Sequence, residues 1–203
     1  MPIKLGLTIF LLSAFSAYGI DLRYWVEPCT RPETGCQKSD VQLAEWALQA
    51  WQAASEGKLH LAKTDSMMQA NIRVHWADSG EGKYGETRAF ESGGIRGAEV
   101  YVMPDLRGMG PDIFAAATQD GLLRETIVYL TCLHETGHAL GLSHTADFAD
   151  IMYYFGYDKG DVREYFGRYR RKLRDRADIA KNSGISPQDR SRLSQVLFIP
   201  LRK

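Results

Sequence analysis

The sequence of 203 residues lacks the features that mark several large classes of protein. Basic and acidic residues number 25 each, so no net charge favours nucleic acid or an anionic membrane as a partner. No internal repeat, low-complexity tract or linker divides the chain. We therefore expect a single-domain monomer without a nucleic-acid partner, whose function lies in a local site.

Long hydrophobic runs are also missing. The apolar run from Leu5 to about Ala17 is shorter than the roughly 20 residues that cross a bilayer, which disfavours the alternative of a membrane anchor. A lysine precedes the run, and a small-x-small pattern ends it at Gly19. This arrangement predicts a signal peptide over residues 1–19, and secretion to the periplasm or the cell exterior without stable membrane insertion.

Cysteine is scarce, with three residues in the chain. Cys29 and Cys36 flank the short segment TRPETG, which contains proline and glycine. In an oxidising compartment we expect these two residues to form a disulfide. Cys132 is left over and is expected to be a small buried hydrophobic residue, not a metal ligand.

Histidine is equally scarce, yet three of the five histidines fall within LHETGHALGLSH, residues 133–144. With this composition the pattern H-E-x-x-H-x-x-G-x-x-H arises by chance on the order of once in 10⁵ such sequences, so it counts as a motif. His60 and His75 lie in alternating patterns typical of strands, and we assign them no function.

Periodicity predicts the secondary structure. A capping-box spacing from Ser39 to Gln42 predicts the start of a long amphipathic helix that runs to Gly57. A second helix is expected from about Leu122 to Gly141, and a third over 186–198 with Ser186 as its N-cap. Segments typical of strands are 22–26, 58–63, 71–76, 86–90 and 99–103, with a turn or bulge over 91–97.

The histidine motif lies on the second helix. Residues four apart share a helix face, so His134 and His138 can bind one ion, with Glu135 offset from them by about 100°. Gly141 can end the helix in a left-handed conformation and allow the chain to return His144 to the same ion. Three imidazoles with an open fourth position indicate one catalytic zinc.

Such an ion lowers the pKa of water from about 15.7 toward 7 and stabilises an oxyanion. Glu135 is placed to accept the proton of the attacking water and to pass it to the departing amine, so amide hydrolysis is the expected reaction. The alternative is a catalytically weak zinc-containing binding protein that docks a partner. A purely structural zinc site would not need the glutamate and would favour a fourth protein ligand.

These residues resemble the metzincin clan of zinc endopeptidases. Met152, eight residues after His144 in DIMYY, and Thr145 directly after that histidine are similar to the matrixin-like members. The resemblance implies that His134, His138 and His144 bind zinc, that Glu135 is the general base, and that Met152 is an apolar floor beneath the metal without being a ligand.

The resemblance also implies the fold and the activity. We expect an α+β metzincin-like catalytic domain over residues 20–203, with a twisted mixed five-stranded sheet, a long N-terminal helix, an active-site helix and a C-terminal helix. The activity implied is that of a secreted zinc metalloendopeptidase. Polypeptide substrates would pair with the edge strand 86–90, and selectivity would lie in a pocket lined by His134, the turn around Tyr153 and the segment after it.

Two departures from the matrixin pattern bear on the site. Tyr154 stands where matrixins usually have proline, whereas astacins and serralysins have a tyrosine there that approaches the zinc. Tyr154 is therefore a candidate donor to the oxyanion or a ligand in the resting enzyme, with an ordinary packed tyrosine as the alternative. ADSGEGKY, residues 77–84, is short and lacks histidine, so we expect one zinc only.

The segment 161–181 is densely charged with interspersed aromatic residues. One interpretation is a solvated helix or mobile loop. The other is a basic surface that attracts an acidic substrate or partner, formed by Arg168, Arg170, Arg171, Lys172 and Arg174.

Overall fold

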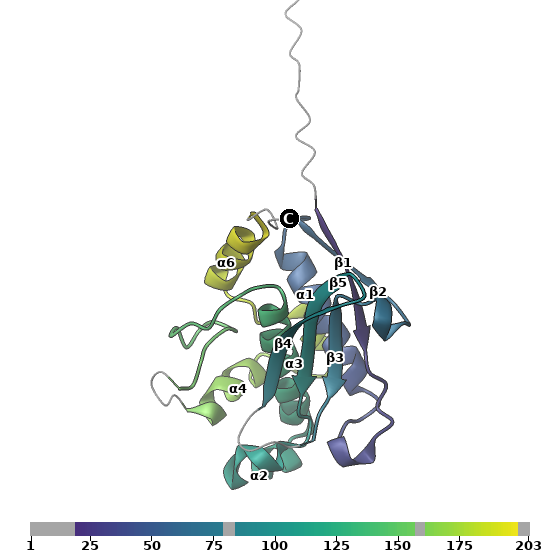
Figure 1. Cartoon of the computed structure of the whole chain (residues 1–203). Coiled ribbons are helices and arrows are strands. Elements are labelled where there is room, and N and C mark those ends of the chain that lie inside the picture. The colour runs from purple at the N-terminus through teal and green to yellow at the C-terminus, as the bar shows by residue number, and fades with distance from the viewer. Residues whose placement is uncertain (1–18, 79–83, 157–160, 199–203) are drawn as a thin grey trace, which may run out of the picture.

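A computed structural model describes residues 19–78, 84–156 and 161–198 (Figure 1). The signal peptide predicted over residues 1–19 lies almost wholly outside these ranges. In chain order the elements are β1 (Ile20–Val26), η1 (Pro32–Thr34), α1 (Asp40–Ala54), β2 (Leu59–Lys63), η2 (Met67–Gln69), β3 (Ile72–Trp76), β4 (Gly85–Ser92), β5 (Ile95–Val102), η3 (Leu106–Met109), α2 (Pro111–Gln119), α3 (Gly121–Ala139), α4 (Val162–Arg170), α5 (Ala177–Lys181) and α6 (Pro187–Phe198).

The five strands form one mixed sheet, as expected from the sequence, and their order is β2-β1-β3-β5-β4 (Figure 1). The β1–β2, β1–β3 and β3–β5 pairs are parallel, and β4 is antiparallel to β5. β4 therefore occupies one edge, as predicted for residues 86–90. Its backbone is left open to pair with another extended chain.

The β4–β5 hairpin is longer than predicted. Glu91 pairs with Arg96 and Ser92 pairs with Ile95, so the turn consists of two residues and not of the whole segment 91–97. Gly93 and Gly94 have φ angles of +58° and +77°. Two successive positive φ angles suit a tight hairpin turn whose twist matches that of the strands, and glycine adopts them at little cost.

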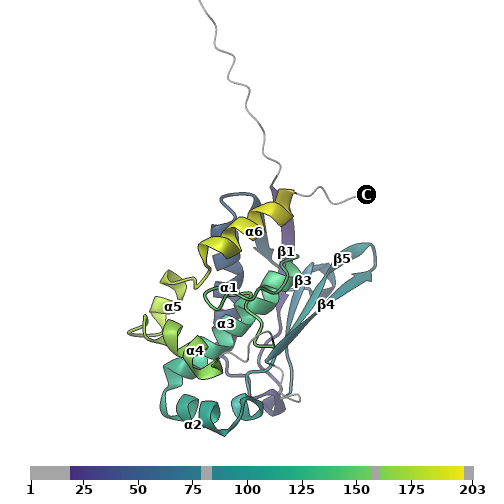
Figure 2. The same ribbon diagram turned by 90° about the vertical axis from the view of Figure 1, so that its left-hand side faces the viewer.

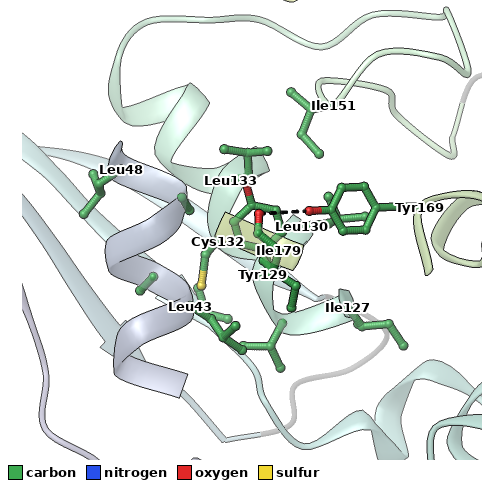
Figure 3. Packing of buried hydrophobic residues seen from close by; sticks show 14 of the residues in the cluster. Leu43, Leu48, Ile127, Tyr129, Leu130, Cys132, Leu133, Ile151, Tyr169 and Ile179 are labelled. Atoms are coloured by element: carbon green, nitrogen blue, oxygen red, sulfur yellow. Dashed lines mark hydrogen bonds between the residues drawn. The ribbon is translucent and has the colours of Figure 1, made fainter. Parts of the chain in front are cut away.

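Helices α1 and α3 pack against each other on one side of the sheet (Figure 2). Leu43 and Leu48 of α1 lie in the same buried cluster as Leu130 and Leu133 of α3 (Figure 3). The indole nitrogen of the fully buried Trp51 donates a hydrogen bond of 2.8 Å to the backbone oxygen of Leu133. This packing fixes α3, the helix that carries the histidine motif, beside α1 and against β4 and β5.

The predicted capping box at the start of α1 is wrong. Ser39 has a helical backbone conformation, and its side chain makes no capping hydrogen bond. The carboxylate of Asp40 instead accepts a hydrogen bond from the backbone of Gln37 and pairs with both terminal nitrogens of Arg124 at 2.6 and 2.7 Å. Asp40 is fully buried, so this charge-assisted pair joins the start of α1 to α3. Residues 55–57 form a turn after α1, which ends before the predicted Gly57.

The charged segment after the histidine motif forms two short helices, α4 and α5. Tyr165, Phe166 and Tyr169 of α4 are buried, which neither a solvated helix nor a mobile loop would show. The basic side chains are partly neutralised, because Arg170 pairs with Asp120 at 2.8 Å and Arg171 pairs with Glu164 at 2.5 Å.

The final helix, α6, begins as predicted. The hydroxyl oxygen of Ser186 accepts a hydrogen bond of 2.9 Å from the backbone of Asp189, and Pro187 is the first helical residue. α2, in contrast, was not expected. Its first residue is Pro111, which follows Gly110, and a proline at the first helical position is a signal for a helix start.

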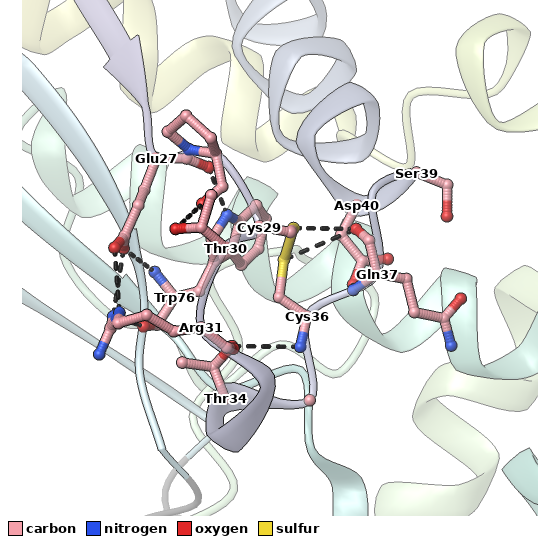
Figure 4. The surroundings of a disulfide bond; sticks show 12 residues. Glu27, Cys29, Thr30, Arg31, Thr34, Cys36, Gln37, Ser39, Asp40 and Trp76 are labelled. Carbon is pink, nitrogen blue, oxygen red and sulfur yellow. Dashed lines mark hydrogen bonds and ion pairs between the residues drawn. A yellow bond between two sulfur atoms is a disulfide. The ribbon is translucent and has the colours of Figure 1, made fainter.

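The predicted disulfide between Cys29 and Cys36 is present in the loop between β1 and α1, with Cα atoms 5.5 Å apart (Figure 4). Cys132 is a free and fully buried thiol, as expected. Within the described ranges, no helix combines the length and the apolar character that crossing a membrane would require.

Candidate metal centre and catalytic cleft

Helix α3 carries the first two histidines of the motif. Asp120 caps its start by accepting hydrogen bonds from the backbones of Leu122 and Leu123, each 3.1 Å long. One helical turn separates His134 from His138, whose ring centroids lie 4.8 Å apart. The helix ends at Ala139, close to the predicted boundary, and Gly141 follows with a φ angle of +95°.

The turn at Gly141 returns the chain to the two helical histidines. The backbone of Leu142 donates to the backbone oxygen of Gly137 at 3.0 Å, which closes the end of the helix. Nε2 of His144 then lies 3.1 Å from Nε2 of His138. One ring nitrogen from each of His134, His138 and His144 lies within 4.8 Å of the other two, so the three could hold a metal ion.

The surroundings of these histidines suit zinc. Nδ1 of His134 lies 2.7 Å from the backbone oxygen of Ile151, and Nδ1 of His138 lies 2.8 Å from that of Leu142. Because a carbonyl oxygen only accepts, Nδ1 carries the proton in both rings and Nε2 is left with a lone pair for a metal. Tetrahedral zinc, with Zn–N bonds of about 2.0–2.1 Å, separates its ligand nitrogens by about 3.3 Å, close to the observed 3.1 Å.

The electrostatic environment favours neutral imidazoles, the form that binds metal. Burial lowers the pKa of His134 to about 3, although the hydrogen bond to Ile151 opposes the shift. Burial and the neighbouring His138 also lower the pKa of His144. The donor set therefore fits zinc in number and in the spacing of His138 and His144, and the lowered pKa values of His134 and His144 favour the form that binds metal.

Glu135 lies at the junction of α3 and the edge strand β4. It is 7% exposed, and burial raises the pKa of its carboxyl group to about 7, while the hydroxyl of Thr87 lowers it. That hydroxyl oxygen lies 2.7 Å from Oε2 of Glu135 and 2.9 Å from its backbone oxygen. Thr87 was not singled out from the sequence, because the contact depends on which face of the edge strand meets α3.

Met152 is fully buried and packs against α3, the helix that carries His134 and His138. A Cβ atom at Gly137 would lie 2.5 Å from Sδ of Met152 and 3.0 Å from the ring of Trp51. Glycine between His134 and His138 therefore lets these two side chains pack directly against α3. The Met152 turn is tied to the third histidine, because the backbone of Thr145 donates to the backbone oxygen of Met152 at 2.8 Å.

Tyr154 follows Met152 by two residues in the same turn, and its side chain lies on the solvent-exposed side of the histidine cluster. It is 45% exposed, and its ring stacks on that of His144 with centroids 4.6 Å apart and an interplanar angle of 20°. A Cβ atom at Gly156 would lie 2.3 and 2.6 Å from two ring atoms of Tyr154 and 2.8 Å from its hydroxyl oxygen, so this ring position requires a glycine there. Tyr154 is thus next to the cluster, and it is not buried in the core.

A cavity of about 740 Å³ opens beside the histidine cluster. Glu135, the three histidines, Tyr154 and the β4 edge line one part of it. The expected lining by His134, Tyr153 and the segment after it is found. The aromatic side chains of Tyr84, Phe155, Tyr165 and Phe166 also line the cavity. Tyr165 and Phe166 belong to α4, whose many charged residues gave no sign in the sequence of an apolar helix face.

This fold and this histidine cluster are those of a metzincin-type zinc peptidase. The family model for Matrixin matches residues 19–165 of the chain, well over half of its length. The chain therefore belongs to the matrixin family, its cofactor is zinc, and it is a zinc-dependent peptidase with polypeptide substrates. No curated protein matches the chain. The predicted C-terminal helix over 186–198 lies beyond the matched residues.

Proposed function

We propose that the chain is a secreted zinc endopeptidase in which His134, His138 and His144 hold the ion and Glu135 is the general base. The observation that carries this proposal is a single cleft that contains the three ring nitrogens and a buried carboxyl group. When bound, zinc supplies a Lewis acid that activates water and polarises the scissile carbonyl.

Glu135 handles the proton in this mechanism. With a pKa raised to about 7, its carboxyl group has access to both protonation states near neutral pH. It can take a proton from the attacking water and give it to the nitrogen of the leaving amine, so that one group serves as base and then as acid. Its low exposure keeps the transfer away from bulk solvent.

The open edge of β4 is the proposed seat for an extended substrate. The backbone of Met103 donates to the backbone oxygen of Tyr84, and that of Ala98 donates across to Asn71 on the other side of β5. By the alternation of an antiparallel ladder, residues 84, 86 and 88 bond to β5, while the N–H and C=O groups of 85, 87 and 89 point to the open edge. A peptide can pair with those groups, and side-chain selectivity then falls to the aromatic pocket.

Tyr154 is proposed as a donor to the oxyanion. Its ring is held against His144 by stacking, and it lines the cleft. A phenolic O–H at this place can stabilise negative charge that develops on the carbonyl oxygen during attack. The two other interpretations, a resting-state ligand and a packed tyrosine, are separated by replacing the hydroxyl alone, as described in the Discussion.

Export and domain organisation are part of the proposal. The predicted signal peptide ends at Gly19, and β1 begins at Ile20, so cleavage would leave the sheet intact. The Cys29–Cys36 disulfide supports an oxidising compartment, periplasmic or extracellular. Residues 20–203 would then form one monomeric catalytic domain. N-terminal sequencing should find Ile20 first in the mature protein, and light scattering should report the mass of one chain.

The decisive experiment compares Glu135→Gln with Glu91→Gln. Glu91 is an exposed carboxylate at the far end of β4, where it pairs with Arg96. We expect Glu135→Gln to keep zinc and fold but to lose about 10²- to 10⁴-fold in turnover, because general-base assistance is removed. Glu91→Gln should cut a denatured protein mixture as the parent does, and a chelator should stop both. Zinc-loaded parent protein that cuts nothing would favour the zinc-containing binding protein instead.

A further inference from the structure

Strand β4 faces the zinc helix with alternate side chains. Gly85 and Thr87 lie two residues apart on the face toward α3, and both approach the same side chain, Glu135. Glu86 and Arg88 lie on the opposite face, where they pair with each other at 2.8 Å. The strand proposed to bind substrate through its backbone therefore meets the general base through the face that carries Gly85 and the side chain of Thr87.

Thr87 offers Glu135 a hydrogen-bond donor. Its hydroxyl oxygen lies 2.7 Å from Oε2 of the carboxyl group, at a distance typical of a strong O–H···O hydrogen bond. The same oxygen lies 2.9 Å from the backbone oxygen of Glu135, and a hydroxyl has one proton to donate. Either bond ties Thr87 to this residue of α3, but only the first orients the carboxyl group.

Gly85 offers Glu135 space. A Cβ atom at this position would lie 2.5 Å from Cγ, 2.9 Å from Cδ and 2.8 Å from Oε1 of Glu135. These distances are below any normal contact, so any side chain at position 85 would force the carboxyl group to move. The φ angle of Gly85 is not in the positive region, so the backbone itself would accept alanine. The strand needs glycine here because of Glu135.

We propose that Gly85 and Thr87 form a cradle that fixes the carboxyl group of Glu135, with Thr87 as a positioning residue and Gly85 as the gap that admits the side chain. The proposal rests on the proposed function, in which Glu135 is the general base. A glutamate has three rotatable side-chain bonds, and a base that must meet one water molecule and one amine gains from being held in one orientation.

The first test removes the hydroxyl of Thr87 and then restores it. Thr87→Val keeps the shape and the backbone groups, so we expect kcat to fall about 10-fold or more with little change in KM and unchanged zinc content. Thr87→Ser keeps the hydroxyl and should retain kcat within about threefold. In the Glu135→Gln background, Thr87→Val should add little further loss, because the residue through which it acts is already removed.

The second test fills the gap. Gly85→Ala should lower kcat and displace the Glu135 side chain in a crystal structure, while the fold seen by circular dichroism stays unchanged. Gly121→Ala is the matched control, since this first residue of α3 has no atom within 4 Å of an added Cβ. It should leave kcat unchanged. The crystal structure of Thr87→Val should likewise show Glu135 in a different orientation, and that of Thr87→Ser should not.

The outcomes distinguish a failure of the cradle from a failure of Glu135 as the general base. Parental kcat in both Thr87→Val and Gly85→Ala, with Glu135→Gln inactive, would overturn the cradle and leave the general base in place. Equal losses in Thr87→Val and Thr87→Ser, with a raised KM, would also overturn it, because a structural role of the strand would explain them. Near-parental turnover in Glu135→Gln would overturn the assignment of the base and the cradle together.

Discussion

The two sides of the zinc cleft differ in how they are held. On the helix side, α3 is packed against α1 and the sheet, and Met152 and Trp51 close directly against it at Gly137. On the open side, β4 has a free backbone edge and Tyr154 is 45% exposed. His134, His138 and Glu135 are thus carried by a helix that packs against the core, and the exposed His144 follows on the turn after it, whereas the surfaces offered to substrate belong to the periphery of the fold.

Substitutions on the two sides of the cleft should therefore impair the enzyme in two different ways. Apart from Glu135, whose replacement by Gln should affect turnover alone, changes on the helix side should disturb metal content or stability, because the groups there pack against buried neighbours. Changes on the open side should leave both intact and alter turnover or substrate affinity. Four substitutions test that separation, and an open-side variant that lost zinc, or a helix-side variant that changed KM alone, would break it.

The largest effect is expected from His134→Ala on the helix side. Loss of one of three imidazoles should remove zinc and reduce hydrolysis to background. His60→Ala is the control, because His60 is exposed on β2 and pairs with Asp21 at the surface. Metal analysis and peptide hydrolysis measure both. A His134→Ala protein without zinc but with full activity would refute the metal site.

Asp150 tests the support beneath the helix side. Burial opposes its charge, but hydrogen bonds from Ser186, Arg192 and Thr145 leave its pKa below the ordinary value of 3.8. A lowered folded-state pKa means that the stabilisation is fully present above about pH 4 and is lost as the pH falls through the folded-state pKa. Asp150→Asn should therefore unfold with about 1–3 kcal/mol less free energy at pH 7.

That difference between parent and Asp150→Asn should shrink in denaturant titrations below about pH 4. The buried Asp189 next to it works in the opposite direction, because burial raises its pKa and acid relieves its charge. The charge of Asp150 contributes to the raised pKa of Asp189, so the comparison measures the loss of the Asp150 charge together with the relief that this loss gives Asp189. A difference that stayed constant down to pH 2 would show that the charge of Asp150 is not what stabilises the fold.

Tyr154→Phe tests the open side with a smaller effect. The ring stacking on His144 is kept and only the hydroxyl is removed, so zinc content and stability should not change. We expect kcat to fall about 10-fold, less than the 10²- to 10³-fold of a buried oxyanion donor, because Tyr154 is partly exposed. Unchanged kcat would identify Tyr154 as an ordinary packed side chain, and lost zinc would identify it as a ligand.

Ala89→Pro should have the smallest effect. The N–H of residue 89 points to the open edge, so proline there costs no bond to β5 but removes one donor to the substrate. We expect KM to rise about 3- to 10-fold. Arg88→Pro is the contrast, because it removes a bond within the sheet and should lower the Tm. A folded Ala89→Pro protein with parental kinetics would place the substrate on another strand.

The sequence was informative where the chemistry depends on neighbours along the chain. The four-residue spacing of His134 and His138 and the left-handed Gly141 are local properties, and the structure brings the three histidines together as predicted. The edge position of residues 86–90 was also foreseen, from the matrixin resemblance. The roles of the individual site residues stay predictions until the substitutions above are measured.

The features that the sequence did not predict depend on contacts between distant parts of the chain. Ser39 and Gln42 have the spacing of a capping box, but Asp40 governs that helix start because Arg124, 84 residues away, pairs with it. The buried face of α4 was hidden because Tyr165 and Phe166 stand among charged residues that point outward. Thr87 likewise gains meaning only when β4 is placed over α3.

The Met152 turn is supported by contacts with α6 and its N-cap. The catalytic domain therefore needs this helix as well as the residues that line the cleft. Ser186 and Arg192 hold the carboxylate of Asp150, and Asp189 accepts the backbone N–H of Ile151 at 2.8 Å. Ser186, which caps α6, and the two helix residues Asp189 and Arg192 all lie after position 165, where the match to the family model stops. A chain trimmed to residues 19–165 would keep every proposed zinc ligand but would lose the contacts that hold Asp150 and Ile151 near His144. The catalytic domain therefore extends beyond the segment that matches the family model.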